Sequence, residues 1–403
     1  MGFSLGRSTI GAAAVMQVLN RKKQVSPRLH RPPSRIWQVL FVPFRRIVLP
    51  LVLRGRRIAR RLRLDVCIIE GKEAVGGEPL SVFCAGASSY PLQLAFGDNR
   101  RKHYEGRVWL WNLRRAIREK GQGCALLLVT VRRPYLRLMR PGNSFVIPAW
   151  VRGEIAIPLG PSVTKQKSVK SDLRRIRKNQ LEFVVTKDPE QFNDFYHHMY
   201  VPHITQAHGR SAFIWRLEAM ARKFEECELL LVRKKEQSIA GILITYAKPT
   251  PRLWSLGVLN GDRRYLKDGA IGALLSFTFE HLERNGHRVA DFGLTRPFLD
   301  DGGLRYKKKW GLTIVGTSSD CFVLEILSPT PGACAFLRSH PFIFCDRGAL
   351  SGAIFVDSGW TSSPEELQRI NLQHSIPGIA KLRLYRLVEA SAVEIEAIPW
   401  EPH

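Results

Sequence analysis

The chain has 403 residues, 45% of them hydrophobic, and carries 62 Lys and Arg against 35 Asp and Glu, a formal net charge of +27 at pH 7. This length indicates two domains with appendages, and the hydrophobic fraction excludes a wholly disordered chain. The seven cysteines are odd in number and form no C-x-x-C pair, which argues against a disulfide framework or a zinc site and fits a reducing cytoplasm.

Residues 1–64 form a basic N-terminal arm. They contain 15 Lys and Arg and no carboxylate, so they supply +15 of the net charge. Two apolar blocks, residues 36–44 and 47–53, are each shorter than the ~20 residues that span a bilayer. Three interpretations stay open: contact with an anionic membrane surface, packing against the rest of the protein, and nucleic-acid binding. A cytoplasmic protein, peripheral on the inner face of the membrane, fits the first.

Residues 65–165 contain a first region of alternating helix and strand signals. The pattern predicts, in order, a basic helix at 109–120, a buried strand at 124–131, and apolar runs at 145–151 and 155–157. Residues 160–166 have the composition of a linker. We therefore expect a domain boundary near residue 165.

Residues 166–335 contain a second region with clearer signals. A strongly basic helix is expected at 168–178, and a helix starts at Asp188-Pro189 with an N-cap and a proline at the first position, ending near Pro202. The remaining expected elements are a helix at 212–224, strands at 181–185, 229–232, 239–247, 253–259 and 289–293, a helix at 268–284, and strands at 313–315 and 321–326. Residues 336–403 form a C-terminal extension with a helix starting at Ser363. This order indicates an α/β or α+β fold with a mixed central sheet.

Three segments resemble the GNAT-like acyltransferase superfamily, in its FemAB-like branch. They are Leu173–Lys178, Asp291 through Phe298, and Gly303–Gly311, the last similar to the "G-L-x-x-F-K-x-x-F-G" segment of that group. The resemblance covers about residues 166–318, and residues 65–165 more weakly as a degenerate first half. It implies a GNAT-like mixed central sheet flanked by helices, in a tandem of two GNAT-like halves behind the basic arm.

The resemblance and the residue types together suggest a reaction centre between residues 290 and 311. Asp291, at a strand end, and Lys307, at the position of the lysine of the matching segment, are the candidate catalytic residues; Asp291 could take a proton from an attacking amine, and Lys307 could bind a phosphate or carboxylate. Candidates for substrate binding are Tyr200, His203, His208, Asp301, Tyr306 and Trp310. Structural alternatives exist: Asp291 or Asp301 as a cap, Lys307–Lys309 as a solvated helix face, and Trp310 as a core residue.

The candidate residues for donor binding are Lys267, Gly269, Ala270 and Gly272. CoA-dependent members of the superfamily carry "[QR]-x-x-G-x-[GA]" at the start of the corresponding helix, and this chain keeps that motif only in part. Backbone N–H groups at a helix start could still hold a phosphate. The basic helix would suit a polyanionic donor. Acyl-CoA, acyl-carrier protein and aminoacyl-tRNA all remain possible co-substrates, with no tightly bound cofactor expected.

The sequence therefore predicts an enzyme, an N-acyltransferase that moves an acyl or aminoacyl group to an amine. The acceptor would be a small-molecule or lipid-linked amine in cell-envelope or polysaccharide metabolism. The alternative is a non-catalytic scaffold that binds anionic membrane or nucleic acid through its arm. No metal is expected at the histidines at 197, 198, 203 and 208. G-x-S-x-G and G-x-x-x-x-G-K-[ST] are absent, which leaves hydrolase and P-loop functions without support.

Overall fold

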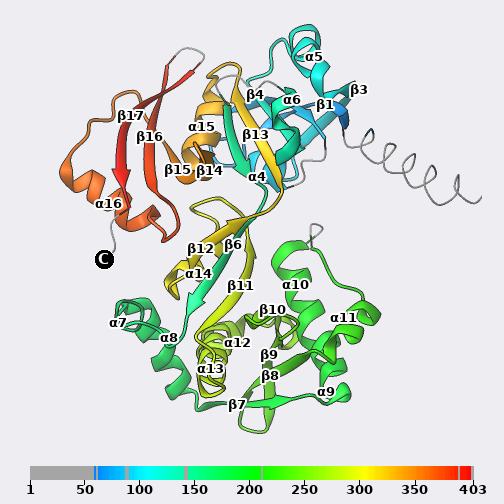
Figure 1. The fold of residues 1–403 in the computed structure, drawn as a ribbon, viewed down its shortest axis with the longest axis vertical. Coiled ribbons are helices and arrows are strands. Elements are labelled where there is room, and N and C mark those ends of the chain that lie inside the picture. Colours follow the sequence, from blue (N-terminus) through cyan, green and yellow to red (C-terminus); the bar gives the residue numbers. More distant parts are fainter. Residues whose placement is uncertain are drawn as a thin grey trace, which may run out of the picture. The chain divides into compact units, whose positions relative to one another are not determined.

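The computed structural model of the chain describes residue 59 and residues 62–86, 90–139, 144–209, 212–388 and 391–400. Apart from residue 59, these belong to one compact unit, Arg61–His403. They form three mixed sheets with helices packed against them (Figure 1), so the predicted α/β class is confirmed. The basic arm lies almost wholly outside the described residues, and the expectations for it stay predictions. No helix within the described ranges is long and apolar enough to cross a bilayer.

The first sheet has six strands in the order β3-β1-β2-β4-β13-β5. In that order the strands are β3 (Arg100–Trp109), β1 (Arg63–Lys72), β2 (Pro79–Ala85), β4 (Leu126–Arg132), β13 (Asp320–Ile326) and β5 (Ser144–Pro148). Only β2 and β4 pair in parallel. Strand β13 comes from far along the chain and lies between β4 and β5. This sheet therefore depends on a strand that follows the second sheet in sequence.

The second sheet has seven strands in the order β12-β6-β11-β10-β9-β8-β7. They are β12 (Thr313–Thr317), β6 (Val151–Ala156), β11 (Val289–Thr295), β10 (Arg252–Val258), β9 (Gln237–Thr245), β8 (Cys227–Lys234) and β7 (Leu181–Thr186). Strand β6 precedes all the others in sequence and is inserted between β12 and β11. Strand β13, which follows the second sheet in sequence, thus belongs to the first sheet. Strand β6, which directly follows β5 of the first sheet, belongs to the second sheet.

The third sheet is formed by the C-terminal extension. Its order is β14 (Phe342–Asp346), β15 (Ala349–Val356), β16 (Lys381–Val388) and β17 (Ser391–Pro399), with β15 and β16 parallel. Two helices accompany it, α15 (Pro331–Ser339) and α16 (Pro364–His374). The Ser363 hydroxyl accepts the Glu366 N–H at 3.2 Å, which confirms the predicted helix start.

Helices cover both faces of the second sheet (Figure 1). Strand β8 shows why: Leu230 and Val232 point into a core shared with α8 (Lys167–Lys178) and α13 (Ala270–Arg284), whereas Leu229 and Leu231 point to the opposite face. That second face is covered by α9 (Pro189–Asp194), a π-helical turn (Phe195–Tyr200), α10 (Val201–His208) and α11 (Leu217–Phe224). Because side chains of a strand alternate between faces, a strand buried on both sides has the continuous apolar sequence seen here.

The remaining helices have four to eight residues. They are α4 (Tyr90–Phe96), α5 (Leu113–Lys120), α6 (Leu136–Met139), α7 (Pro161–Thr164), α12 (Arg263–Asp268) and α14 (Gly302–Lys309). The helix predicted at 109–120 starts only at Leu113, because β3 continues to Trp109 and a 3₁₀ turn follows. The helix predicted at 268–284 starts at Ala270, after a left-handed Gly269 that ends α12.

The prediction that the helix from Asp188 ends near Pro202 is wrong. Its start is confirmed, since Asp188 Oδ1 accepts the Glu190 N–H at 2.9 Å. The helical path then continues through the π-helical turn into α10, and Pro202 lies in the first turn of α10. A proline is tolerated there because the hydrogen-bonding pattern restarts and its missing N–H leaves no ladder bond unmade.

Candidate active site

The two parallel strands of the second sheet meet at one position and then separate. Strands β10 and β11 pair at Arg252 and Asp291, and both strands are irregular just beyond that point. The register of β11 against β6 shifts between Asp291 and Leu294, and Gly293 adopts a φ of +75° there. Positive φ is readily available only to glycine. We refer to this separation, with the bulge at Gly293, as the β10–β11 opening.

Lys307 stabilises the bulged strand. Its Nζ donates hydrogen bonds to the carbonyl oxygens of Phe292 at 2.7 Å and Leu294 at 3.1 Å, and to Thr295 Oγ1 at 2.8 Å. The three N–H groups of an ammonium are thereby matched by three protein acceptors. Burial lowers the pKa of Lys307 to about 8, although the nearby carboxylates Asp291 and Asp301 oppose the shift.

Asp291 is buried beside the same bulge. Its Oδ1 accepts the N–H of Gly293 at 2.8 Å, and its Oδ2 lies 3.5 Å from Arg252 Nε. In this geometry the carboxylate caps the turn of the strand, which was the structural alternative to proton transfer. The structure thus brings the two predicted catalytic residues together, each already bonded to the backbone of β11.

Helix α14 is anchored through each of the residues that the sequence singled out. The carboxylate of Asp301 accepts the N–H groups of Gly303 at 2.9 Å and Leu304 at 3.1 Å, so it is the N-cap. Lys308 donates to the carbonyls of Leu372 and Gln373 at the end of α16, and burial lowers its pKa to about 8. Lys309 binds the carboxylate of Asp172 on α8. The lysine run is therefore not a solvated helix face; each ammonium binds a different element.

The predicted substrate platform at Trp310 is a core residue. Trp310 has no exposed surface, and its ring lies 5.8 Å from that of Phe279. A side chain without exposed area cannot contact a substrate in this conformation, so that prediction is corrected. Tyr306 is half-buried with the Lys309 ammonium 5.2 Å from its ring centre, and burial raises its pKa.

The residues predicted around position 200 do not form one exposed group. Tyr200 is buried, burial raises its pKa, and its hydroxyl accepts the N–H of Trp215 at 3.2 Å. This bond ties the π-helical turn to the segment before α11, so Tyr200 is positioned for packing and not for substrate contact. His203 is half-buried on α10, and the side chain of His208 lies outside the described residues.

The predicted donor-binding residues lie at the junction of α12 and α13, which α8 covers. The N–H of Gly269 bonds to the carbonyl of Leu266 at 3.2 Å and is not available to a phosphate. Ala270 is fully buried, and Lys267 is exposed. A Cβ on Gly272 would lie 2.9 Å from Asp172 Cβ. The small residues of this segment allow two helices to pack closely, and donor binding at the start of α13 stays a prediction.

Asp172 is the site residue that the sequence analysis missed. Its carboxylate is buried and binds Lys309, and Arg175 Nη1 lies 3.4 Å away. A signal was available, because Asp172 is the one carboxylate of α8 and lies three residues after Val169 and four before Ile176, on the apolar face. A carboxylate on the buried side of a basic helix points to a buried cation elsewhere in the chain.

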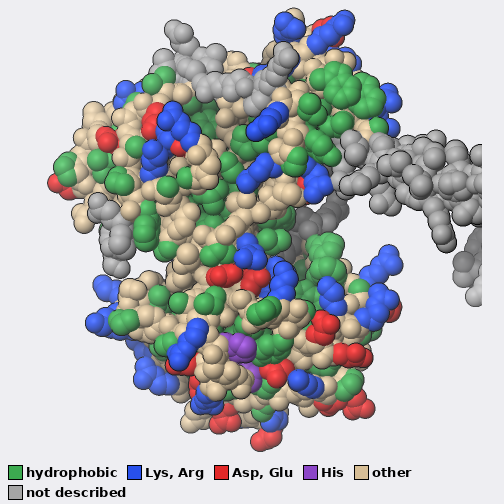
Figure 2. Space-filling view, in the orientation of Figure 1, with side chains coloured by type: hydrophobic (Ala, Val, Ile, Leu, Met, Phe, Trp, Pro, Cys, Tyr) green, Lys and Arg blue, Asp and Glu red, His purple; other side chains and the backbone are tan. Residues whose placement is uncertain are grey.

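The outer face of α8 is strongly basic. Six of its side chains are exposed cations: Lys167, Lys170, Arg174, Arg175, Arg177 and Lys178. Among the described residues only Arg175 of these forms an ion pair, with Asp172. Figure 2 shows Lys and Arg side chains gathered over α7 and α8. This surface adjoins the α12–α13 junction, since a Cβ on Gly269 would contact Arg175.

No family model and no curated protein matches the chain. Solved structures do resemble it. L-PGS from Bacillus licheniformis is 13% identical, with 63% of this chain and 82% of that chain covered and a TM-score of 0.33. FemX is 12% identical over 63% and 83%, also with a TM-score of 0.33. A tandem GNAT protein from the clavulanic acid biosynthesis pathway is 12% identical over 63% and 81%, with a TM-score of 0.26.

Two of these neighbours, FemX and the tandem GNAT protein, carry names of the group that the sequence resemblance indicated. Among the described residues no group of three or more His, Cys, Asp or Glu is arranged to hold a metal ion.

Proposed function

We propose that this protein transfers an acyl or aminoacyl group from an activated donor to an amine at the β10–β11 opening. The observation that carries the proposal is the single parallel pair at Arg252 and Asp291, followed by a bulge with the Lys307 amine beside it. Separated parallel strands expose backbone N–H and carbonyl groups that a sheet would otherwise consume, and an extended substrate can pair with such groups.

Lys307 contributes charge and position to this reaction. Attack of an amine on an activated carbonyl develops negative charge on the carbonyl oxygen, and a fixed cation nearby stabilises it. Lys307 also fixes the carbonyls of Phe292 and Leu294, and thereby the orientation of the backbone around Gly293.

The donor that the surface charge favours is an aminoacyl-tRNA. The six exposed cations of α8 suit a polyanion. Asp172 and Arg175 meanwhile cover the first turn of α13, where a CoA pyrophosphate would be expected, and the N–H of Gly269 is already bonded. Acyl-CoA remains the second donor to test. The acceptor in this proposal is a small-molecule or lipid-linked amine, with residues 1–64 contacting an anionic membrane.

Donor binding and transfer can be measured separately. A gel shift with charged tRNA, set beside calorimetric titration with acetyl-CoA, identifies the donor, and mass spectrometry of an amine acceptor panel reports transfer. We expect a shift with tRNA, little heat with acetyl-CoA, and a mass increase of one aminoacyl group. Heat with acetyl-CoA and no gel shift with tRNA would identify acyl-CoA as the donor instead. Absence of transfer from every donor would leave the non-catalytic scaffold as the better description.

A further inference from the structure

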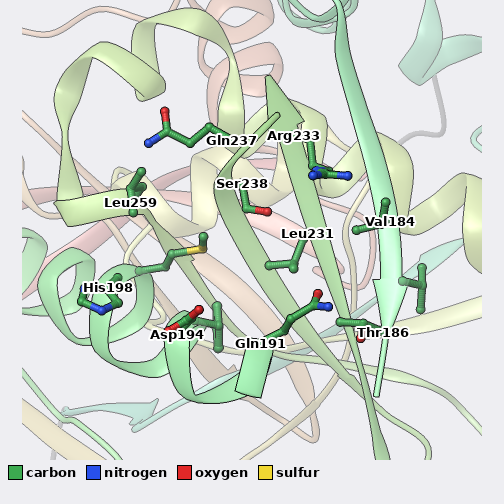
Figure 3. A pocket seen from close by; sticks show the side chains of 13 residues that line it. Val184, Thr186, Gln191, Asp194, His198, Leu231, Arg233, Gln237, Ser238 and Leu259 are labelled. Carbon is green, nitrogen blue, oxygen red and sulfur yellow. The ribbon is translucent and has the colours of Figure 1, made fainter. Parts of the chain in front are cut away.

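A second concave site lies between the strands β7, β8 and β9 and the helical path from α9 into the π-helical turn (Figure 3). Its volume is about 670 Å³, within the range of about 300–1,000 Å³ that is usual for small-molecule sites. Arg252, Asp291 and Lys307 are not among the residues that line it. We call it the π-turn cavity.

The floor of the π-turn cavity is apolar and closely packed. Phe195 and Leu231 form part of it, and a Cβ on Gly241 would lie 2.6 Å from the Phe195 ring. Met199 contributes as well, and a Cβ on Gly257 of β10 would lie 2.4 Å from its carbonyl carbon. Glycines on two strands therefore allow the π-helical turn to lie directly on the sheet. Such turns are rare and occur frequently at functional sites.

The strand side of the cavity presents hydrogen-bond donors. Arg233 follows a register shift in β8, and a bulge of this kind re-aims a side chain. Its Nε is buried without a hydrogen-bond partner among the described residues, while Nη2 donates to the carbonyl of Glu236 at 3.2 Å. The Glu236 carboxylate, 3.9 Å from Arg233 Nη2, is fully exposed and therefore competes only weakly with a ligand for the guanidinium. Gln237 accepts the Tyr265 hydroxyl through Oε1 at 3.1 Å, so its amide NH₂ remains as a donor.

The helix side presents acceptors. Asp194 and His198 are four residues apart and lie together on the helical path, across the cavity from Arg233 (Figure 3). Asp194 forms no ion pair within the described ranges. Gln191 donates through Nε2 to Asp188 Oδ2 at 3.3 Å, which leaves its Oε1 as an acceptor. The two sides of the cavity thus have opposite charge and opposite hydrogen-bonding character.

We propose that the π-turn cavity binds a zwitterionic ligand of dipeptide size. Its carboxylate would bind Arg233 and the amide of Gln237, both of which line the cavity, since a guanidinium is matched by a carboxylate. Its ammonium would bind Asp194 and Gln191, and its apolar side chains would contact Val184 and Leu259, which line the cavity and are not buried. The volume accommodates more than one amino-acid residue. This site is separate from the β10–β11 opening, so the proposal does not depend on the proposed transfer reaction.

Calorimetric titration of the full chain with alanyl-leucine and two matched probes tests this proposal. N-acetyl-alanyl-leucine lacks the ammonium, and alanyl-leucinamide lacks the carboxylate. We expect the free dipeptide to bind at least about tenfold more tightly than either, the effect of one charge-assisted hydrogen bond. In Arg233→Met the dipeptide and alanyl-leucinamide should bind with equal affinity. In Asp194→Asn the dipeptide and N-acetyl-alanyl-leucine should bind with equal affinity.

Two exposed residues far from the cavity provide controls. Arg118→Met on α5 and Asp98→Asn before β3 change the same charges and should leave all three affinities unchanged. Urea unfolding of each variant checks that it folds, and if Arg233→Met does not, Gln237→Leu tests the same end of the cavity with an expected loss of at least about threefold. The proposal would be overturned if the three probes bound with equal affinity or if the dipeptide did not bind. Unchanged binding in folded Arg233→Met and Asp194→Asn would overturn it as well.

Discussion

The amine of Lys307 is hydrogen-bonded to two backbone carbonyls of the bulge at Gly293, and its removal should be costly. In Lys307→Met the carbonyls of Phe292 and Leu294 lose their donor. A buried acceptor left without a partner costs about 1–3 kcal/mol, so we expect the free energy of unfolding to fall by about that amount, chiefly through the Phe292 carbonyl, together with loss of transfer activity. Urea denaturation measures the first effect. Lys72→Met, at an exposed strand end, is the control, and equal stability of the two variants would contradict this role.

Lys307 should also leave a signature in the pH dependence of stability. Its pKa in the folded protein is about 8, below the ordinary value of 10.5. Between these values the unfolded chain binds more protons than the folded one, so Lys307 makes the free energy of unfolding rise with pH across that window. Lys307→Met lacks this contribution. Unfolding both proteins at about pH 7.5 and about pH 10 compares them, and an identical rise in both would show that another group causes it.

The residues around Lys307 show what the sequence could and could not predict. The caps at Asp188, Asp301 and Ser363 depend on the next two or three residues, so local pattern was enough to suggest them. The partners of Lys307 are 12 to 15 residues away and those of Lys308 are 64 and 65 away. Nothing in a run of three lysines reveals acceptors at such distances, which is why a solvated face remained an equal alternative.

At the scale of elements, the contact between α8 and α13 depends on a glycine. A Cβ on Gly272 would lie 2.9 Å from both Cβ and Cγ of Asp172. Gly272→Ala should therefore displace α8 or Asp172 and destabilise the fold by about 1–3 kcal/mol, as overpacking does. Gly302→Ala is the matched control, because a Cβ at that helix start meets no atom within 4 Å. Thermal unfolding compares them, and equal midpoints would show that the contact adjusts freely.

The exposed face of α8 gives an electrostatic prediction for the same element. The triple variant Lys170→Ala, Arg174→Ala, Arg177→Ala removes three exposed cations that form no ion pair within the described ranges. If these contact phosphates, tRNA affinity should fall and the slope of log affinity against log salt should decrease by about 2–3. Arg115→Ala with Arg118→Ala on α5 should leave the slope unchanged. Equal slopes in all three proteins would exclude α8 as the tRNA surface.

At the scale of the whole molecule, one polar network joins strand β8 to helix α13 and to the residue that follows strand β9. Glu228 Oε2 lies 2.8 Å from His281 Nε2 on α13 and accepts the hydroxyl of Tyr246, also at 2.8 Å. Despite the opposing effect of burial, these hydrogen bonds and the charge of His281 lower the pKa of Glu228 below its ordinary 4.5. Its stabilising contribution is present above pH 4.5 and is lost as the pH falls through the lowered value.

Glu228→Gln should therefore be less stable than wild type at neutral pH and should lose less stability on acidification. Acid unfolding followed by circular dichroism measures both. Glu283→Gln, an exposed neighbour on α13, should follow the wild-type curve. Parallel acid curves for wild type and Glu228→Gln would show that the network contributes nothing to stability.

The pairing of the sheets makes a final prediction about cooperativity. Strand β6 lies inside the second sheet and strand β13 inside the first. Such long-range pairings leave no mark in the local sequence. The boundary near residue 165 could therefore be placed only by composition. A fragment of residues 166–335 would lack β6, which separates β12 from β11, and would carry β13 without its partners β4 and β5.

We expect that fragment to unfold without a sharp transition, because a missing central strand leaves backbone groups and apolar side chains of its neighbours unpaired. Residues 62–400 should unfold in one cooperative step, with both probes of sheet content and tryptophan burial changing together. A cut engineered between Pro158 and Pro161 supplies the decisive comparison. The two pieces should stay associated under native conditions, since each holds a strand of the other's sheet. If residues 166–335 alone unfold cooperatively, or the cut pieces separate, the sheets are independent and the exchanged strands are not what holds them together.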